Sequence, residues 1–330
     1  MPDLTFVIIV IAIALVFDFV NGFHDSANSI ATVVATNVLR PRNAVMMAAF
    51  WNFIGAFVFS VAVATTIGKG IIDTKAVSAQ LILGALIGAI AWNLITWYYG
   101  LPSSSSHALI GGLIGAGIVA SGFQSIILPG LEKVIIFIFV APIVGFICAI
   151  IFSVIMMWAF SKKKPAKINN YFRKLQLVSS SFYSLGHGTN DAQKTMGIIS
   201  LLLFTSGYIS SFYVPKWVII ISHASIALGT YFGGWRIIKT MGLKITKLTP
   251  FHGFAAETSG GLVLFVTALF GIPVSTTHVI SGSIMGVGSV KRASGVRWQI
   301  ARRIIWAWVL TIPIAAIIGG VSYYAIKIFI

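Results

Sequence analysis

The 330-residue sequence has few charged residues, very few acidic residues and a single cysteine. Lysine, arginine, aspartate and glutamate together make up 9% of the chain, whereas soluble globular proteins carry about 25%. So few charges cannot cover a surface that faces water, and the composition therefore excludes a soluble enzyme. The lone cysteine, Cys148, excludes a disulfide framework and a cysteine-based metal site.

The sequence consists largely of long runs of apolar residues. Hydrophobic residues account for 58% of the chain, and about 20 apolar residues suffice to cross a bilayer. We therefore predict an all-α integral membrane protein whose outer surface contacts the lipid bilayer. The first run has no basic n-region or cleavage site and is predicted to be a membrane segment, not a signal peptide. The apolar runs lie near residues 4–20, 43–67, 79–99, 107–120, 131–160, 195–213, 215–235, 254–271, 278–290 and 301–329.

Two of these runs, 107–120 and 278–290, are too short to cross a bilayer. Each follows a proline and a cluster of serine or threonine residues. Irregular backbone inside a membrane occurs only where protein or water covers it. We predict broken or re-entrant helices that meet near the membrane midplane, and we expect a binding site there.

Two motifs occur twice, in the same order and at nearly the same offset. Gly22–Asn28 (G-F-H-D-S-A-N) corresponds to Gly188–Lys194 (G-T-N-D-A-Q-K). Pro102–His107 and Pro273–His278 share the pattern Pro-x-Ser-(Ser/Thr)-(Ser/Thr)-His. This recurrence indicates an internal duplication, which is common among secondary transporters. The predicted divisions are a first repeat over 1–160, a basic linker over 161–178 and a second repeat over 179–330.

Basic residues occur in non-equivalent loops of the two halves. In the first half Arg40 and Arg42 follow the Asp25 motif, whereas the corresponding loop near 205–214 has no basic residue and the positive charge comes later. Because cytoplasmic loops are enriched in lysine and arginine, equivalent loops are predicted on opposite sides, which is inverted topology. We predict a multi-pass protein of the cell inner (plasma) membrane with both termini outside and the basic loop 162–174 cytoplasmic. The formal charge of +16 then reflects topology, and no nucleic-acid partner is expected.

Asp25 and Asp191 are carboxylates in otherwise apolar sequence. A charge near the bilayer centre costs about 2.5–3.5 kcal/mol on insertion scales. The alternative is a helix-capping aspartate near the membrane interface. The duplicated context favours an ion or substrate site.

The two Ser/Thr motifs are suited to holding an anion. Proline and serine favour the start of a helix, where free N–H groups and the positive end of the helix dipole attract negative charge. Two such starts related by a pseudo-two-fold axis would surround a small tetrahedral oxyanion. His107 and His278 are predicted to fix the turns by hydrogen bonds to backbone carbonyls, and the glycines after them to allow close helix packing. The candidate hydroxyl groups belong to Ser104, Ser105, Ser106, Ser275, Thr276 and Thr277.

Together, the four motifs resemble those of the inorganic phosphate transporter (PiT) family, in particular its bacterial phosphate permeases. The resemblance spans nearly the whole chain and implies an inverted-repeat transporter that forms homodimers and needs no cofactor besides its coupling ion, H⁺ or Na⁺. It implies that the Ser/Thr turns hold phosphate and that motif Asp and Asn residues bind the coupling cation. By position, the cation-binding residues are Asp25, Asn28, Asn190 and Asp191, with Asp25 and Asp191 as the ligands if sodium or a divalent ion binds.

Two residues depart from the sodium-coupled members, which resemble G-x-N-D-x-x-N in both halves. His24 replaces the first Asn of one motif, and Lys194 replaces the last Asn of the other. An ammonium group beside Asp191 can take the electrostatic place of a sodium ion, and a histidine can exchange protons in the physiological pH range. Both changes resemble the bacterial branch associated with protons and with neutral metal-phosphate substrates. Glu257, another acid in an apolar run, is predicted to carry a proton or to pair with a buried cation such as Lys194.

The sequence thus predicts a secondary active transporter that imports phosphate with a cation, protons being favoured. The alternatives are a sodium-coupled phosphate symporter and a permease for sulfate or another oxyanion. A passive anion channel is another class. A hydrolase using Ser104 or Ser105 with His107 is disfavoured, because no acid partner or nucleophile elbow is present.

Overall fold

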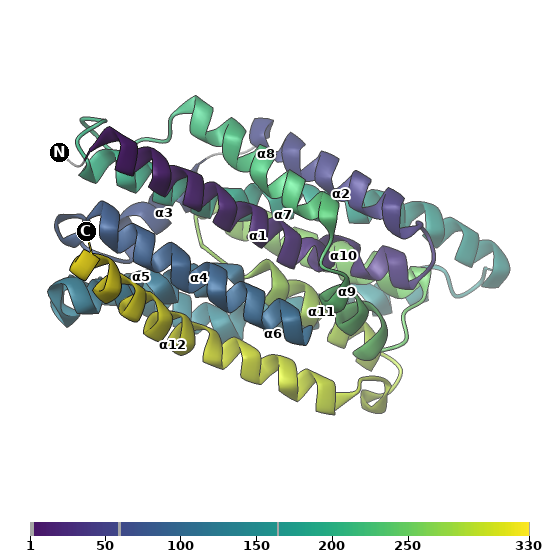
Figure 1. Cartoon of the computed structure of the whole chain (residues 1–330). Helices are drawn as coiled ribbons and strands as arrows, with labels where there is room; N and C mark the ends of the chain where they lie inside the picture. Colours follow the sequence, from purple (N-terminus) through teal and green to yellow (C-terminus); the bar gives the residue numbers. More distant parts are fainter. Residues whose placement is uncertain (1–2, 59–60, 164, 330) are drawn as a thin grey trace.

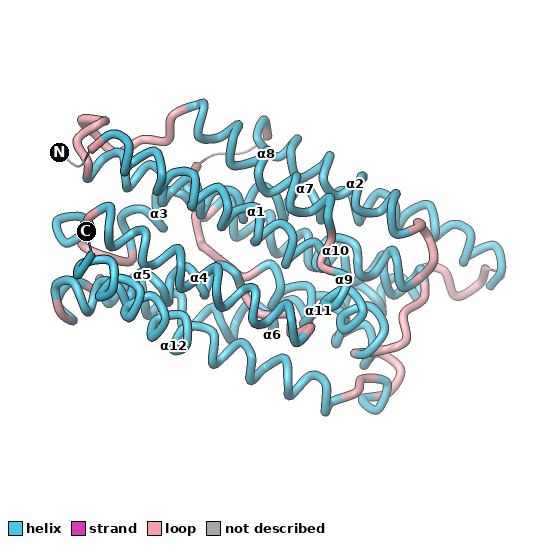
Figure 2. Tube along the Cα trace, viewed as in Figure 1, coloured by secondary structure: helices cyan, strands magenta, loops and turns pink. Residues whose placement is uncertain are grey.

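A computed structural model describes residues 3–58, 61–163 and 165–329, and these residues form a bundle of helices without a β-strand (Figure 1, Figure 2). Four of the helices, α1, α4, α6 and α12, are long and apolar enough to cross a membrane, and two bent pairs bring the total to as many as six. Large apolar side chains are exposed along these helices, as a lipid-facing surface requires. The helices are α1 (Leu4–Ala35), α2 (Pro41–Ile54), α3 (Ala62–Gly70), α4 (Ala79–Tyr99), α5 (Ser105–Ser121), α6 (Leu128–Ala159), α7 (Pro165–Thr205), α8 (Lys216–Phe232), α9 (Trp235–Lys239), α10 (Pro250–Leu269), α11 (Thr276–Ser289) and α12 (Trp298–Phe329).

The first helices of the two halves, α1 and α7, run antiparallel. The Arg173 side chain, near the start of α7, donates to the carbonyl of Asn37 just beyond the end of α1 (2.9 Å). Further along α7, the Ser180 hydroxyl donates to the carbonyl of Ser29 (3.1 Å). Both chain ends lie at one end of the bundle (Figure 1). This course is the one that inverted repeats require.

The two short helices, α5 and α11, begin inside the bundle. Each starts after an extended segment at a serine N-cap: the hydroxyl of Ser104 accepts from the His107 N–H, and that of Ser275 accepts from the His278 N–H, both at 3.2 Å. The predicted broken helices are therefore confirmed, and α5 and α11 are short because their N-caps lie inside the bundle. Because a Ser hydroxyl satisfies one free N–H of the first turn, a helix can begin away from water.

Each short helix packs on the last helix of the other half. α5 lies along α12, and α11 lies along α6. Glycines make this possible: a Cβ at Gly115 would overlap the carbonyl oxygen of Ala316, and one at Gly282 would overlap that of Pro142. The predicted role of the glycines in close packing is confirmed, and the two halves are interlocked through backbone contacts.

Two predicted boundaries need correction. The basic segment 162–174, expected as a loop, is helical from Pro165 onward, so the predicted linker 161–178 is largely the first part of α7. Lys164 lies outside the described residues. The run 43–67 is not one segment either: α2 ends at Ile54, a 3₁₀ turn covers Gly55–Phe57, and α3 begins at Ala62.

We expect Gly115→Ala to destabilise the protein, because the added methyl group meets a backbone carbonyl that cannot move aside. The melting temperature in detergent should fall clearly. Gly186→Ala, in mid-α7, is the matched control, since the nearest atom to its new Cβ is a Leu264 side-chain carbon at 3.7 Å and alanine favours helix. Equal melting temperatures for the two variants would contradict the packing argument.

Candidate functional site

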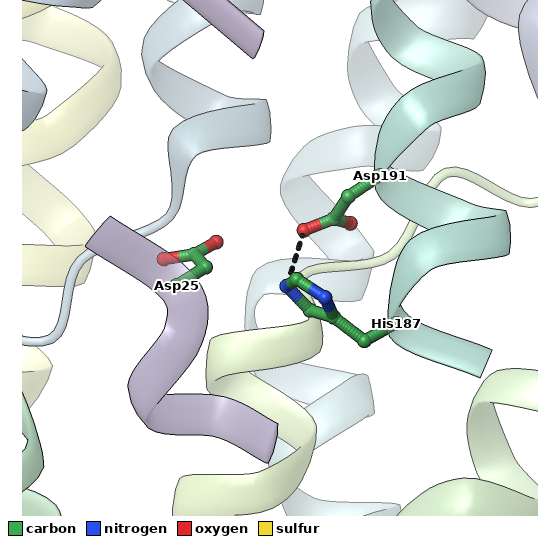
Figure 3. A group of neighbouring side chains, drawn as sticks. All are labelled: Asp25, His187 and Asp191. Atoms are coloured by element: carbon green, nitrogen blue, oxygen red, sulfur yellow. Dashed lines mark ion pairs between the residues drawn. The ribbon is translucent and has the colours of Figure 1, made fainter. Parts of the chain in front are cut away.

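The repeated aspartates meet at the centre of the bundle. Asp25 on α1 and Asp191 on α7 are buried, and one carboxylate oxygen of each lies within 4.8 Å of the other and of a ring nitrogen of His187. Figure 3 shows the two carboxylates facing one another, with His187 Nε2 3.2 Å from Asp191 Oδ2. The antiparallel crossing of α1 and α7 thus brings together residues that are 166 positions apart in the sequence.

The starts of α5 and α11 meet beside these aspartates. The His107 and His278 rings pack edge to face with centroids 4.9 Å apart, and His278 also stacks on Trp308 at 4.1 Å. His278 Nδ1 lies 3.3 Å from the Ile138 carbonyl, so its predicted backbone hydrogen bond is confirmed. The ring nitrogens of His107 have no hydrogen-bond partner among the described residues, so the prediction was wrong there.

The α11 hydroxyl groups bind directly to the motif residues of both halves. The Thr276 hydroxyl donates to Asp191 Oδ2 (3.1 Å), and the Thr277 hydroxyl donates to Asp25 Oδ1 (3.3 Å). Asn28 Nδ2 donates to both threonine oxygens, at 3.2 and 2.9 Å. A predicted cation residue, Asn28, and two predicted phosphate residues therefore form one network.

Lys194 supplies the positive charge of this centre. Its buried ammonium group donates to Asp191 Oδ1 and to the Ser106 hydroxyl on α5. Asp191 thus has a lysine, a histidine and a threonine around it. The predicted placement of an ammonium group beside Asp191 is confirmed.

His24 connects Asp25 to α4. Its Nδ1 lies 2.6 Å from Asp25 Oδ1, and its Nε2 lies 3.1 Å from the Thr96 hydroxyl oxygen. The Ser103 hydroxyl donates to the Thr96 oxygen (2.8 Å) and so joins the segment before α5 to this chain. All four side chains are buried, so they form a hydrogen-bonded chain that is closed off from the protein surface.

Two predicted site residues have surroundings other than those expected. Glu257 does not pair with Lys194: its carboxylate accepts from Thr32 and Ser179, both at 2.5 Å, and from Gln176 at 3.0 Å. Asn190 Nδ2 is held by the carbonyls of Gly186 and Leu264.

Several polar atoms at the centre are left without a partner in the described part of the chain. These are the Ser105 hydroxyl and the side-chain oxygens of Asn28 and Asn190. All three residues are buried, and buried polar groups are ordinarily paired. They are the groups best placed to bind a ligand between the two short helices.

Sequence reasoning missed His187 and Tyr183. The Tyr183 hydroxyl donates to the Thr276 carbonyl (2.9 Å) and so supports the first turn of α11. His187 is four residues before Asp191 and therefore on the same helix face; that spacing was the available signal. Carboxylate oxygen and imidazole nitrogen together are ligands for divalent metal ions, so Asp25, His187 and Asp191 form a candidate metal-binding set.

The chain is similar to known phosphate transporters in both sequence and fold. A family model described as "Phosphate transporter family" matches residues 21–319. A "Probable low-affinity inorganic phosphate transporter" of Rhizobium meliloti (strain 1021) is 57% identical over 316 residues, covering 96% of this chain and 95% of that protein. A protein of the same name from Bacillus subtilis (strain 168) is 46% identical over 97% of both chains. The solved structure of a sodium-dependent phosphate transporter superposes with a TM-score of 0.89 at 25% identity, over 99% of this chain and 100% of that one.

We expect Lys194→Met to lower the free energy of unfolding by roughly 3–5 kcal/mol, because it leaves Asp191 as a buried charge without its ammonium partner. Thermal unfolding in detergent measures the loss. The double variant Asp191→Asn/Lys194→Met should recover most of it, since both charges are then gone. Lys133→Met, at an exposed lysine of α6, is the control; a Lys194→Met variant as stable as this control would contradict the ion pair.

Proposed function

Because the chain belongs to the phosphate transporter family, we propose that it imports inorganic phosphate by secondary active transport coupled to a cation. The family and its relatives are transporters and not enzymes. The proposal rests above all on one observation: two Ser/Thr-rich helix starts meet beside two buried aspartates and a buried lysine. That combination offers anion donors and charge-compensating groups in one enclosed place.

Phosphate would bind between the starts of α5 and α11. Each start presents backbone N–H groups and the positive end of a helix dipole. The hydroxyls of Ser104 and Ser275 serve as caps, so we assign them to shaping the turns. We assign direct donation to the backbone, to the unpartnered Ser105 hydroxyl and to the Ser106 hydroxyl. The Thr276 and Thr277 hydroxyls, which donate to the aspartates in this structure, would turn from the carboxylates to phosphate when it binds.

The buried charges explain why a cation would accompany phosphate. Asp25 and Asp191 against Lys194 leave an excess of one negative charge in the empty centre. A divalent phosphate adds two more, and uncompensated charge is very costly in a medium of low dielectric constant. Protons, sodium or a divalent metal carried as neutral metal-phosphate would remove this excess.

We favour protons over sodium as the coupling ion. Lys194 already places an ammonium group on Asp191, and Asp25 is in contact with a histidine, a residue suited to proton exchange near neutral pH. Glu257, held by three donors on α1 and α7, is a further proton carrier in this scheme. The alternative is sodium coupling at Asp25, Asn28, Asn190 and Asp191; it is favoured by the name of the sodium-dependent phosphate transporter, which shares this fold.

Sulfate is the rival substrate, because a tetrahedral oxyanion fits the same helix starts. Phosphate carries protons that a carboxylate can accept, whereas sulfate at neutral pH has none, so the paired aspartates favour phosphate. Hydrolysis by Ser105 and His107 finds no support, since neither the Ser105 hydroxyl nor the His107 ring has a hydrogen-bond partner in the described residues.

The antiparallel halves support transport by inverted repeats over 1–160 and 179–330. We propose that both termini face the outside of the inner membrane, that the basic segment 162–174 faces the cytoplasm, and that the protein assembles as a homodimer. Cysteine-accessibility labelling of residues 163 and 3 in intact cells, together with crosslinking, would test these assignments.

Phosphate uptake into proteoliposomes tests the function and the coupling ion together. We expect labelled phosphate to accumulate above equilibrium under an inward proton gradient without sodium, and unlabelled sulfate in tenfold excess to compete weakly. Phosphate accumulation that only a sodium gradient can drive would favour sodium as the coupling ion instead of protons. Uptake that never exceeds equilibrium under either gradient would identify a passive channel and contradict the proposal.

Ser105→Ala should weaken phosphate binding by about 10–100-fold, since a hydrogen bond to a charged group contributes about 1.5–3 kcal/mol. Its hydroxyl has no partner in the described protein, so stability should be nearly unchanged. Ser153→Ala, another buried and unpartnered serine on α6, is the control. Equilibrium binding of labelled phosphate to the purified protein gives the comparison, and unchanged affinity in Ser105→Ala would remove this residue from the site.

A further inference from the structure

Four of the seven acidic residues of the chain are buried, and three of these four are well satisfied. Asp25 contacts His24 and Thr277. Asp191 and Glu257 each have three partners, as described above. The fourth acid, Asp18 on α1, is completely buried, and neither of its carboxylate oxygens has a hydrogen-bond partner among the described residues.

Asp18 is surrounded by other unpaired polar groups. Its polar neighbours are Asn21, one turn along α1, and Thr195 on α7, whose side chains are close to the carboxylate but do not reach hydrogen-bond geometry with it. The amide oxygen and nitrogen of Asn21 and the hydroxyl of Thr195 are likewise buried and without a partner in the described part of the chain. The charged groups that act on Asp18 are Asp191 and Lys194, both on α7. A carboxylate, an amide oxygen and a hydroxyl oxygen are a set of hard oxygen donors.

The cluster of Asp18, Asn21 and Thr195 lies near the central site but is separate from it. Residues 18, 21 and 25 follow one face of α1 at helical spacing, so the cluster lies about two turns from Asp25, toward the end of the bundle that carries the chain termini (Figure 1). Thr195 directly follows Lys194, whose ammonium group is bound to Asp191 and Ser106. Within the described residues, Asp18 shares no hydrogen bond with that network.

An ionised carboxylate in this position is expensive. A charged side chain buried within a membrane helix is costly, and Lys194, the cation that the described residues place near Asp18, is already bound to Asp191. The cost is removed if a small cation sits among the three oxygen-bearing side chains. Without such a cation, no other group of the described residues would balance the charge of the Asp18 carboxylate.

We propose that Asp18, Asn21 and Thr195 form a second cation site, separate from the central one, that holds one monovalent coupling cation during transport. This site rests on the proposed function, cation-coupled phosphate transport. A proton would bind Asp18 alone, whereas a sodium ion would be coordinated by all three oxygens; each supplies the single positive charge that balances one carboxylate, and the two arms of the test below distinguish them. In either case one cation moves per cycle in addition to any that accompany phosphate at the centre.

The test is the stoichiometry of transport, measured in proteoliposomes with the membrane potential clamped to zero. Wild-type protein and Asp18→Asn are compared under a tenfold inward proton gradient without sodium, and under a tenfold sodium gradient at equal pH. Losing one coupled cation lowers the maximal phosphate accumulation ratio about tenfold in the arm whose ion the site binds. Glu132→Gln, which removes an exposed carboxylate on α6, should accumulate phosphate as wild type does.

Phosphate binding to purified Asp18→Asn should stay within about twofold of wild type, because the central site is intact. An unchanged accumulation ratio in both arms would overturn the second site. Wild-type protein that fails to accumulate phosphate at all would instead overturn the proposed function, and this site with it. If Asp18→Asn does not fold, Thr195→Val tests the site instead. This variant should raise the cation concentration for half-maximal phosphate uptake about fivefold, because the cation loses one oxygen ligand. An unchanged concentration would reject the site.

Discussion

The ion pair between Lys194 and Asp191 is the interaction on which the arrangement of the bundle centre depends. Both groups are buried, and removing charges from water is compensated only by close partners with good geometry. The side chains around the pair come from four helices: His187 on α7 itself, Ser106 on α5, Thr276 on α11 and Asp25 on α1. The half-helices have to begin beside this pair, because their hydroxyl groups complete its surroundings.

The sequence predicted the parts of this centre that local chemistry specifies. Proline, serine and histidine in two similar turns indicated the starts of α5 and α11, and the repeated aspartates indicated a shared site. Partners across helices were harder to predict, because they depend on crossing angles and side-chain rotamers. His187 was missed although its spacing from Asp191 was readable, and Glu257 was given Lys194 as a partner although Thr32, Gln176 and Ser179 surround it. The helix beginning at Pro165 was missed because its basic composition resembles a loop, while its tertiary contacts, such as that of Gln176 with Thr36, were not visible.

The two halves are joined more closely than a division into consecutive repeats suggests. Each short helix lies against the final helix of the opposite half, and glycines bring backbone to backbone at both contacts. α6 and α12 also each contain an internal proline, Pro142 and Pro313, in corresponding places. Pro142 leaves the carbonyl of Ile138, four residues earlier, without its helical N–H donor, and His278 Nδ1 on α11 lies 3.3 Å from that carbonyl. A helix that loses a backbone hydrogen bond at proline can therefore still be covered by its neighbour, which is a requirement for irregular backbone in lipid.

The row of rings formed by His107, His278 and Trp308 has a mechanical consequence. Trp308 stacks on His278 and donates through its indole N–H to the Pro102 carbonyl (3.0 Å), immediately before α5. The row therefore links the tip of α11, the entry to α5 and the middle of α12 in a closed loop of contacts. One helix tip cannot move sideways without separating these stacked rings or moving the other tip with it. Any movement of one tip relative to the other therefore requires these stacked rings to slide along one another.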